Sequence, residues 1–311
     1  MSKSMQTSQE SSCSEAFEPW EYWGSVVTAN ENHQDNIRQA LRGFELDLPT
    51  GVAVVTVGSD GKLERFAQSM TELVLISDNA KESALRERLG KYCKVSVPDM
   101  DFEFAYDGLP GFFALDNEVP FSFVYGDHRL IYPDFLLNSS LLVGDPVVWV
   151  QARQRVLDEQ LDQRTGQGIR RAVRKQLTHH RQIMRNGADA KTTHWSFADA
   201  VQYYDESSSV YGFKMGPIRA VQRKLDLLTL AALPLKAEDL PTSTVERVAF
   251  FVREGRVTSE LGEAVSVSYL WFLQRYHQAQ MVYKDARQPV SQPFCQEDFK
   301  SNSAAIWEFI G

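Results

Sequence analysis

Hydrophobic and polar positions follow two different periods along this chain, and the change comes near residue 146. Before that point the apolar runs have strand length. Val52–Val57 is an apolar, mostly β-branched run that ends at Gly58-Ser59, and Glu72–Ile76 is a second short run. Short runs of this kind bounded by turn residues are typical of buried strands. The stretch from Val95 to Tyr125 is also strand-like and aromatic, with Pro and Gly between its parts.

Helical spacing dominates elsewhere. In the first half, Asn30–Leu48 and Lys81–Tyr92 carry apolar residues three or four positions apart, with Leu85 and Leu89 facing inward in the second segment. In the second half, the segments with a helical pattern are Val147–Met184, Trp195–Tyr204, Ile218–Leu233 and Ala264–Val282. We therefore predict an α+β chain with a disordered, Ser/Gln-rich tail over 1–14, an α/β domain over 15–146 and a helical domain over 147–311.

Composition narrows the class of protein. The chain has 311 residues and a formal net charge of −8, which disfavours general nucleic-acid or anionic-membrane binding. Its three cysteines are far apart, and no run approaches the ~20 apolar residues of a membrane span. These features predict a soluble, cytoplasmic protein that does not bind a membrane.

The candidate chemistry lies at the end of the first strand. A strand that ends in Gly58-Ser59 before a helical turn lets the backbone approach a phosphate group, which the turn amides and the serine hydroxyl can hold. Two acids at i and i+2 on the next strand would share one face and could hold Mg²⁺ across a triphosphate. This chain has Glu72 at the second position and Met70 at the first, and a thioether is a poor ligand for Mg²⁺.

The segment Gly58–Ile76 resembles the nucleotidyltransferase signature of the polymerase-β superfamily, in which Gly-Ser is followed at a fixed distance by Ser-Asp-x-Asp and an apolar run. The spacing agrees without a gap. Lys62 and Glu64 fall where the bacterial PII-uridylyltransferase-like branch has the Arg and Glu of Gly-Arg-x-Glu. Met70 falls on the first acidic position and Glu72 on the second, so the metal site is degraded relative to the family.

Two later segments extend the resemblance. Leu136–Asp145 is similar to a family stretch that ends in an apolar pair and Gly-Asp, but Asn138 and Ser140 stand where an acid and an arginine are expected. The turn Lys214-Met215-Gly216-Pro217-Ile218-Arg219 resembles the family's Lys-x-x-Pro-Gly-Gly-Leu-Arg-Asp turn, with Ala220 in place of the acid.

The resemblance implies a polymerase-β-like sheet domain followed by an all-α helical bundle. It implies binding of ATP or UTP with Mg²⁺ as cofactor, and transfer of the nucleoside monophosphate to a hydroxyl of a protein or small molecule. Glu72 is the implied catalytic residue and metal ligand. The implied nucleotide-binding residues are Gly58, Ser59, Lys62, Lys214 and Arg219.

Two alternatives stay open. Asp101 and Glu103, together with Asp99, could supply metal-binding carboxylates from a neighbouring strand, although their alternation is also typical of a solvent-facing edge strand. The replaced charges at Met70, Asn138 and Ser140 favour a catalytically dead module used for regulation or for binding a partner. The intact Gly58-Ser59 turn, with Lys214 and Arg219, fits a weakened enzyme.

One basic run falls outside the motifs. On a helix, Ile169, Val173 and Leu177 would form a buried stripe, leaving the cations of Arg170–Arg185 outside. That face is either a solvated surface or a basic wall facing a triphosphate or an acidic partner.

Overall fold

The structure is a computed structural model, and only part of the chain is described. The described residues are 17–65, 71–97, 100–101, 111–116, 135–189, 194–196, 214–286, 291–293 and 296–311. The predicted tail, the residues Asp99 and Glu103, and the position of Met70 lie outside them.

A mixed β-sheet forms the first half of the described fold. Its strands follow the order β3-β2-β1-β5, and β4 pairs with β2 on the same edge as β3. β1 is antiparallel to β2 and β5, whereas β3 and β4 are parallel to β2. The strands are β1 (Val52–Thr56), β2 (Thr71–Ser77), β3 (Met100–Asp101), β4 (Gly111–Ala114) and β5 (Ser140–Gly144).

Helices make up most of the remaining described structure, and one small antiparallel strand pair lies apart from the sheet. The helices flanking the strands are α1 (Pro19–Glu45), α2 (Gly58–Gly61), the 3₁₀ turn η1 (Ala80–Ala84) and α3 (Leu85–Ser96). The later helices are α5 (Pro146–Leu161), α6 (Gln163–Asp189), the π-helical turn η4 (Lys214–Ile218), α7 (Arg219–Ala232), α8 (Thr244–Arg253), α9 (Ser259–Ala286) and α10 (Gln296–Ile310). The separate strand pair is β6 (His194–Ser196) and β7 (Ser291–Pro293).

The sheet is covered on both faces, which explains why β1 is apolar along its whole length. Ala53 and Val55 belong to a core shared with the helices of the second half. Val52 and Val54 point into a second core, formed with α1 and α3. Alternate side chains of a strand face opposite sides, so a strand buried on both faces needs a continuous apolar run.

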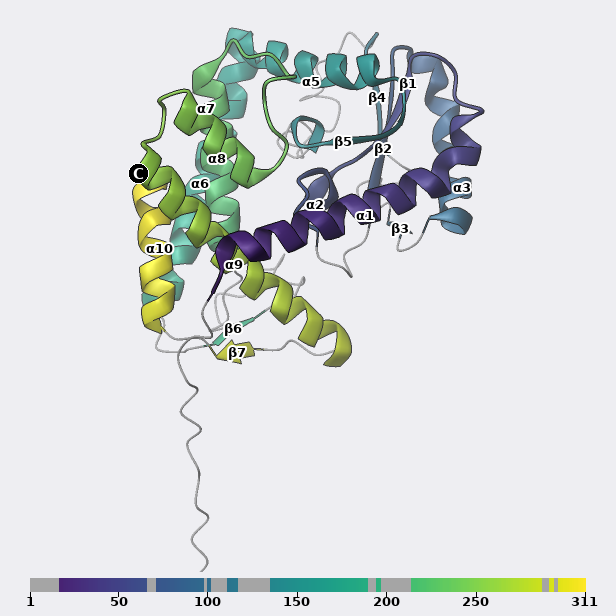
Figure 1. Cartoon of the computed structure of the whole chain (residues 1–311). Coiled ribbons are helices and arrows are strands. Elements are labelled where there is room, and N and C mark those ends of the chain that lie inside the picture. The colour runs from purple at the N-terminus through teal and green to yellow at the C-terminus, as the bar shows by residue number, and fades with distance from the viewer. Residues whose placement is uncertain are drawn as a thin grey trace, which may run out of the picture.

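The long helix α1 joins the two halves (Figure 1). Its first part contacts α9 of the bundle, and its later part lies across β5 and against α3. The buried positions of α1 are Val26, Asn30, Gln34, Ile37, Leu41 and Phe44. Two of these six are polar, so the buried face of α1 is only partly hydrophobic.

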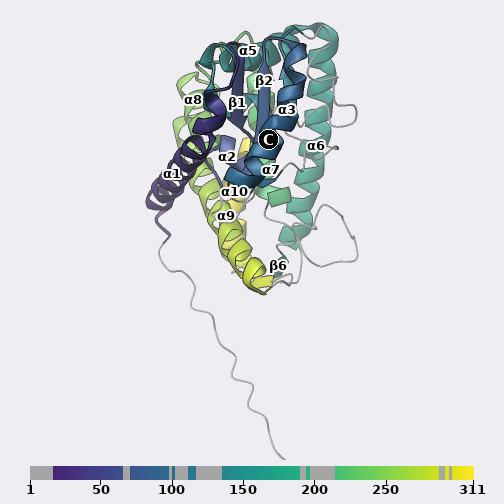
Figure 2. The same ribbon diagram turned by 90° about the vertical axis from the view of Figure 1, so that its right-hand side faces the viewer.

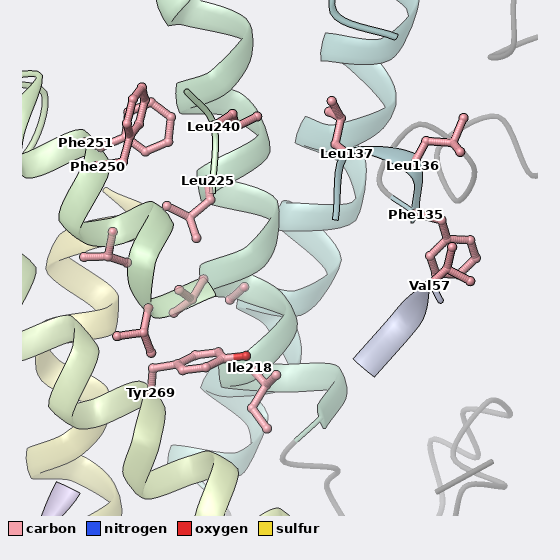
Figure 3. Close-up of a cluster of buried hydrophobic side chains, with 14 of the residues drawn as sticks. Val57, Phe135, Leu136, Leu137, Ile218, Leu225, Leu240, Phe250, Phe251 and Tyr269 are labelled. Atoms are coloured by element: carbon pink, nitrogen blue, oxygen red, sulfur yellow. The ribbon is translucent and has the colours of Figure 1, made fainter. Parts of the chain in front are cut away.

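The helical half packs around one large cluster that also includes one face of the sheet. Figure 3 shows part of it, with Val57 and Phe135 on the sheet side, and Ile218, Phe251 and Tyr269 from the bundle. In Figure 2, α6 is one long helix along the side of the molecule, and it packs against α5, α7, η4 and α10. The fold class is therefore α+β and mostly helical. The predicted boundary near 146 coincides with the start of α5, but the shared core does not divide there, and the two-domain division stays a prediction.

The predicted elements largely agree with the structure. The strands predicted over Val52–Val57 and Glu72–Ile76 are found as β1 and β2, and the predicted helices near residues 85, 219 and 264 are found as α3, α7 and α9. The helix predicted over Val147–Met184 is two helices, because α5 ends at Leu161 and α6 begins at Gln163. The helix predicted over Trp195–Tyr204 is wrong where it can be compared: Trp195 pairs with Gln292 across β6 and β7, and this distant pairing overrides the local pattern.

None of the described helices combines the length and the apolar character needed to cross a bilayer.

Candidate functional site

The turn after β1 is built around Gly58. Gly58 is the first residue of α2 and has a φ of +65°, a conformation that L side chains rarely adopt. A Cβ atom at this position would lie 2.3 Å from Oε2 of Glu72. The Val57 amide also donates to the Glu72 carbonyl over 3.1 Å. The strand-to-helix turn and the Glu72 carboxylate are thus side by side, as the sequence predicts.

The turn has a partly exposed side with Ser59, its front, and a buried side with Gly61, its back. Gly58, Ser59 and Glu72 are half-buried, and the Oε2 atom of Glu72 that faces Gly58 is itself buried. Gly61 is buried, and a Cβ there would come within 2.1 Å of the Asn138 carbonyl oxygen. The back of the turn therefore packs directly on the backbone before β5, which holds the front in place.

A second acidic position lies beside Glu72. In the parallel pairing of β2 with β3, Glu72 is the direct register partner of Asp101. The side chain of Asp101 and the whole of Glu103 lie outside the described part of the chain. Within the described residues, no group of three or more His, Cys, Asp or Glu side chains could hold a metal ion. Glu72 is thus the one candidate metal ligand whose carboxylate the structure places at the turn.

The predicted cations have different surroundings. Lys62 is buried, with 4% of its surface exposed. Arg219 is half-buried at the start of α7 and donates from Nη1 to Oε1 of Gln222 over 3.0 Å. Gln222 in turn reaches Glu64 of the turn segment, so Arg219 lies on the side of α7 connected to the sheet. The backbone of Lys214 begins η4, and its side chain lies outside the described residues.

Asp60 lies inside the turn, with 1% of its surface exposed. Its carboxylate is 3.1 Å from Nε of Arg65 and 3.8 Å from Nε2 of His33. Burial raises the pKa of Asp60 to about 7, although Arg65 and the backbone amide of Glu72 act in the opposite direction. Asp60 therefore belongs to the interior of the turn and does not face the exposed side with Ser59.

Positions that depart from the family pattern have internal roles. Oδ1 of buried Asn138 accepts from Nη1 of Arg247 over 2.9 Å, and the Ser140 hydroxyl donates to the Gly61 carbonyl over 3.0 Å. Ala220 is fully buried in the main core. A charged side chain at Ala220 would have to be desolvated in this structure.

The basic helix α6 has the predicted buried stripe. Ile169, Val173 and Leu177 are buried, and so are His180 and Met184. Two of its arginines hold backbone carbonyls: Arg170 donates to Leu230 over 2.8 Å, and Arg181 donates to Ile310 and Gly311. The exposed cations of this helix include Arg171, Arg174 and Lys175.

Sequence reasoning missed a buried polar network behind the turn. Glu64 is 4% exposed and is bonded to residues of α7, α8 and α9. The resemblance of Gly61–Glu64 to a Gly-Arg-x-Glu motif is the sequence signal that singles out this residue. The partners Tyr269 and His277 carried no local signal, because they come from a helix about 200 residues further along the chain.

No protein-family model matches this chain, and no curated protein matches it.

Proposed function

We propose that this chain is a protein of the nucleotidyltransferase type that binds a nucleoside triphosphate, ATP or UTP, at the Gly58–Ser59 turn, with weakened transfer of the nucleoside monophosphate to a hydroxyl. The observation that carries the proposal is the contact between Gly58 and Glu72. A residue without a side chain and a carboxylate lie together at a half-exposed strand end. Such a turn allows a phosphate to approach the backbone, with a metal ligand beside it.

The pairing of the neighbouring strands supports this proposal. The backbone register pairs Asp101 with Glu72, and we propose that a second carboxylate comes from β3, because Met70 occupies the first acidic position of the pattern that this segment resembles. Arg219 is linked to the turn segment through Gln222 and Glu64, which lie behind the turn. A triphosphate needs positive charge opposite the glycine turn, and Arg219 with Lys214 are the candidates from the bundle.

The metal that we propose for this turn is one Mg²⁺ ion. Mg²⁺ is commonly held by one or two carboxylates and completes its shell with water and phosphate oxygens, which matches Glu72 with Asp101. When bound, the ion would neutralise charge on the triphosphate. Glu72 would hold the ion, and the backbone of Gly58 and the Ser59 hydroxyl would orient the phosphates.

Titration calorimetry of ATP and UTP, each with and without Mg²⁺, tests the proposal. We expect binding that Mg²⁺ strengthens by at least about tenfold, because a metal-bridged carboxylate contributes more than a kilocalorie per mole. Glu72→Ala should remove this metal dependence. Glu87→Ala, which removes an exposed carboxylate from α3, is the matched control and should bind like the wild type. Absence of binding for both nucleotides with Mg²⁺ would refute the proposal.

A second candidate function is a catalytically dead module that binds a regulatory or partner protein. The burial of Asn138 and Ala220 favours it, because both occupy charged family positions yet serve internal packing here. This function predicts neither nucleotide binding nor metal dependence in the same titration.

A further inference from the structure

Glu64 lies where the turn segment meets the helical bundle. Its carboxylate accepts three hydrogen bonds from residues more than 150 positions away in the sequence. Oε1 accepts from the backbone amide of Thr244 over 3.0 Å, and Oε2 accepts from the Tyr269 hydroxyl over 2.7 Å and from the Gln222 amide over 3.3 Å. These donors come from α8, α9 and α7, so one side chain contacts three helices.

All three donors are uncharged, and one of them, the Thr244 amide, lies at the N-terminal end of a helix. Thr244 is the first residue of α8, where backbone amides have no partner within the helix. A carboxylate at this end is favoured by the helix dipole. Ser243 caps the same end by accepting from the Glu246 amide over 3.2 Å. Glu64 therefore supplies a further cap to α8 from the sheet half of the chain.

The backbone of Glu64 is held as firmly as its side chain. Its amide donates to the Ser59 carbonyl over 2.9 Å, which closes the turn segment on itself. Its carbonyl accepts from Nε2 of His277 over 3.1 Å. Because a carbonyl only accepts, Nε2 carries the proton, and Nδ1 then accepts from the Tyr22 hydroxyl over 2.7 Å. Glu64 is in this way connected to Ser59 at the front of the turn and to α1 and α9 behind it.

We infer that Glu64 is a positioning residue that fixes the Gly58–Ser59 turn against the bundle, so that the proposed nucleotide site forms only when the turn and helices α7, α8 and α9 are in register. The inference rests on the proposed function only for its consequence in binding. The positioning of the turn against the bundle is inferred from the hydrogen bonds of Glu64 alone. Burying a carboxylate costs free energy unless hydrogen bonds satisfy its oxygens. Loss of one donor to Glu64 should therefore destabilise the turn.

Two conservative variants test this role. Tyr269→Phe removes one hydroxyl donor and keeps the ring, and Glu64→Gln keeps the shape but replaces one acceptor by an amide donor that opposes Gln222. The matched control is Tyr92→Phe, which removes a hydroxyl bonded to the Ala40 carbonyl over 3.0 Å, between α3 and α1. The control is the same chemical change at a contact that does not involve the turn.

Amide hydrogen exchange is the direct readout. We expect both network variants to speed exchange at the Gly61, Leu63 and Glu64 amides by about fivefold or more relative to the amides of β1, as loss of one buried hydrogen bond implies. Tyr92→Phe should leave this ratio within about twofold of the wild type. A ratio unchanged in Tyr269→Phe would overturn the inference, even if Glu64→Gln failed to fold.

The nucleotide titration separates this inference from the proposed function. If the wild type binds ATP or UTP, the network variants should weaken that binding by about fivefold and the control should not. If the wild type binds neither, the proposed function fails, and the exchange ratio at the turn still decides whether Glu64 positions it.

Discussion

Gly58 is where a single side chain most directly decides the candidate site. Its φ of +65° is matched by Gly255, whose φ is +66°. The two differ in their surroundings: a Cβ at Gly58 meets the Glu72 carboxylate, whereas a Cβ at Gly255 has no atom within 4 Å. Substituting each glycine in turn therefore distinguishes two effects. Backbone strain arises at both positions, whereas displacement of Glu72 arises at Gly58 alone.

We predict that Gly58→Ala and Gly255→Ala each lower the free energy of unfolding by about 1–2 kcal/mol, the cost of a left-handed conformation for an L residue. The Glu72 carboxylate is the end of a flexible side chain and can move aside, so the extra cost at Gly58 is small. Its displacement should abolish Mg²⁺-dependent nucleotide binding in Gly58→Ala only. Denaturant unfolding and calorimetry measure the two effects. Equal nucleotide binding by both variants would show that the Gly58–Glu72 contact has no role in it.

His277 gives the structure a dependence on pH. Burial lowers its pKa from 6.5 to about 4, against the opposite effect of the bond to the Glu64 carbonyl. Between these pH values the unfolded chain takes up a proton that the folded chain does not, so stability falls as the pH falls. The contribution lost between pH 7 and pH 5 is about 2 kcal/mol.

We therefore expect His277→Gln to be less stable than the wild type at pH 7, and this difference to shrink at pH 5. Asp60, whose pKa is raised to about 7, stabilises the fold on acidification, but it is present in both proteins and cancels in the difference. Urea unfolding at several pH values gives the comparison. A difference that stays constant from pH 7 to pH 5 would mean that His277 is not held neutral by burial.

At the scale of elements, α1 is the helix whose start the sequence did not reveal. The apolar pattern predicts a helix from Asn30, whereas α1 begins at Pro19. The reason lies in Asn30 and Gln34, which occupy the buried face at helical spacing but are polar. The Asn30 side chain accepts from the Arg65 amide over 2.9 Å and donates to the Arg65 carbonyl over 3.2 Å. Gln34 donates to the Asp60 carbonyl over 2.9 Å.

Through these hydrogen bonds α1 holds the back of the turn in place. The substitution Asn30→Ala tests this role of α1. The substitution leaves the buried amide and carbonyl of Arg65 without the Asn30 bonds, so we expect a loss of at least about 2 kcal/mol in the free energy of unfolding. Asn36→Ala, at an exposed position of the same helix, should change it by less than about 0.5 kcal/mol. Chemical denaturation of both variants measures the difference. Equal losses of unfolding free energy in the two variants would show that Asn30 does not hold the turn in place.

The strands and helices that the sequence predicted well are those with a strong local period. β1 is apolar over Val52–Val55 and β2 over Leu73–Ile76, and α3 and α6 have regular buried stripes. β6 was missed because its pairing partner, β7, lies about 100 residues away. The position of Glu72 at the turn could be predicted from strand order and spacing. The bonds of Glu64 could not, since they depend on how α7, α8 and α9 pack.

At the scale of the whole molecule, the sheet and the bundle meet through buried polar groups as well as apolar ones. Tyr269 lies in the main core in Figure 3, and its hydroxyl reaches Glu64. Burial raises the pKa of Tyr269 well above its usual value, with the Glu64 carboxylate adding to the effect, so this hydroxyl stays a donor at physiological pH. The turn is therefore supported from α1 on one side and from the bundle on the other.

We propose that the whole molecule serves to bind a nucleoside triphosphate at the Gly58–Ser59 turn, with a metal held by Glu72. Met70 stands where the polymerase-β signature that this segment resembles has its first acid, and a strand period of two predicts that it shares the face of Glu72. Losing one preorganised electrostatic contact typically costs about 3–4 kcal/mol at a transition state, or roughly 10²–10³ in rate, so wild-type transfer should be slight.

Calorimetric titration of ATP and UTP with Mg²⁺ into the wild type, Met70→Asp and Glu72→Ala is the most direct test. We expect Met70→Asp to bind more tightly than the wild type, because a further carboxylate joins Glu72 at the ion, and we expect Glu72→Ala to lose the dependence on Mg²⁺. A labelled-nucleotide assay on the same proteins should show little transfer by the wild type. Tight binding or robust transfer by the wild type that Glu72→Ala leaves unchanged would place the chemistry elsewhere in the molecule.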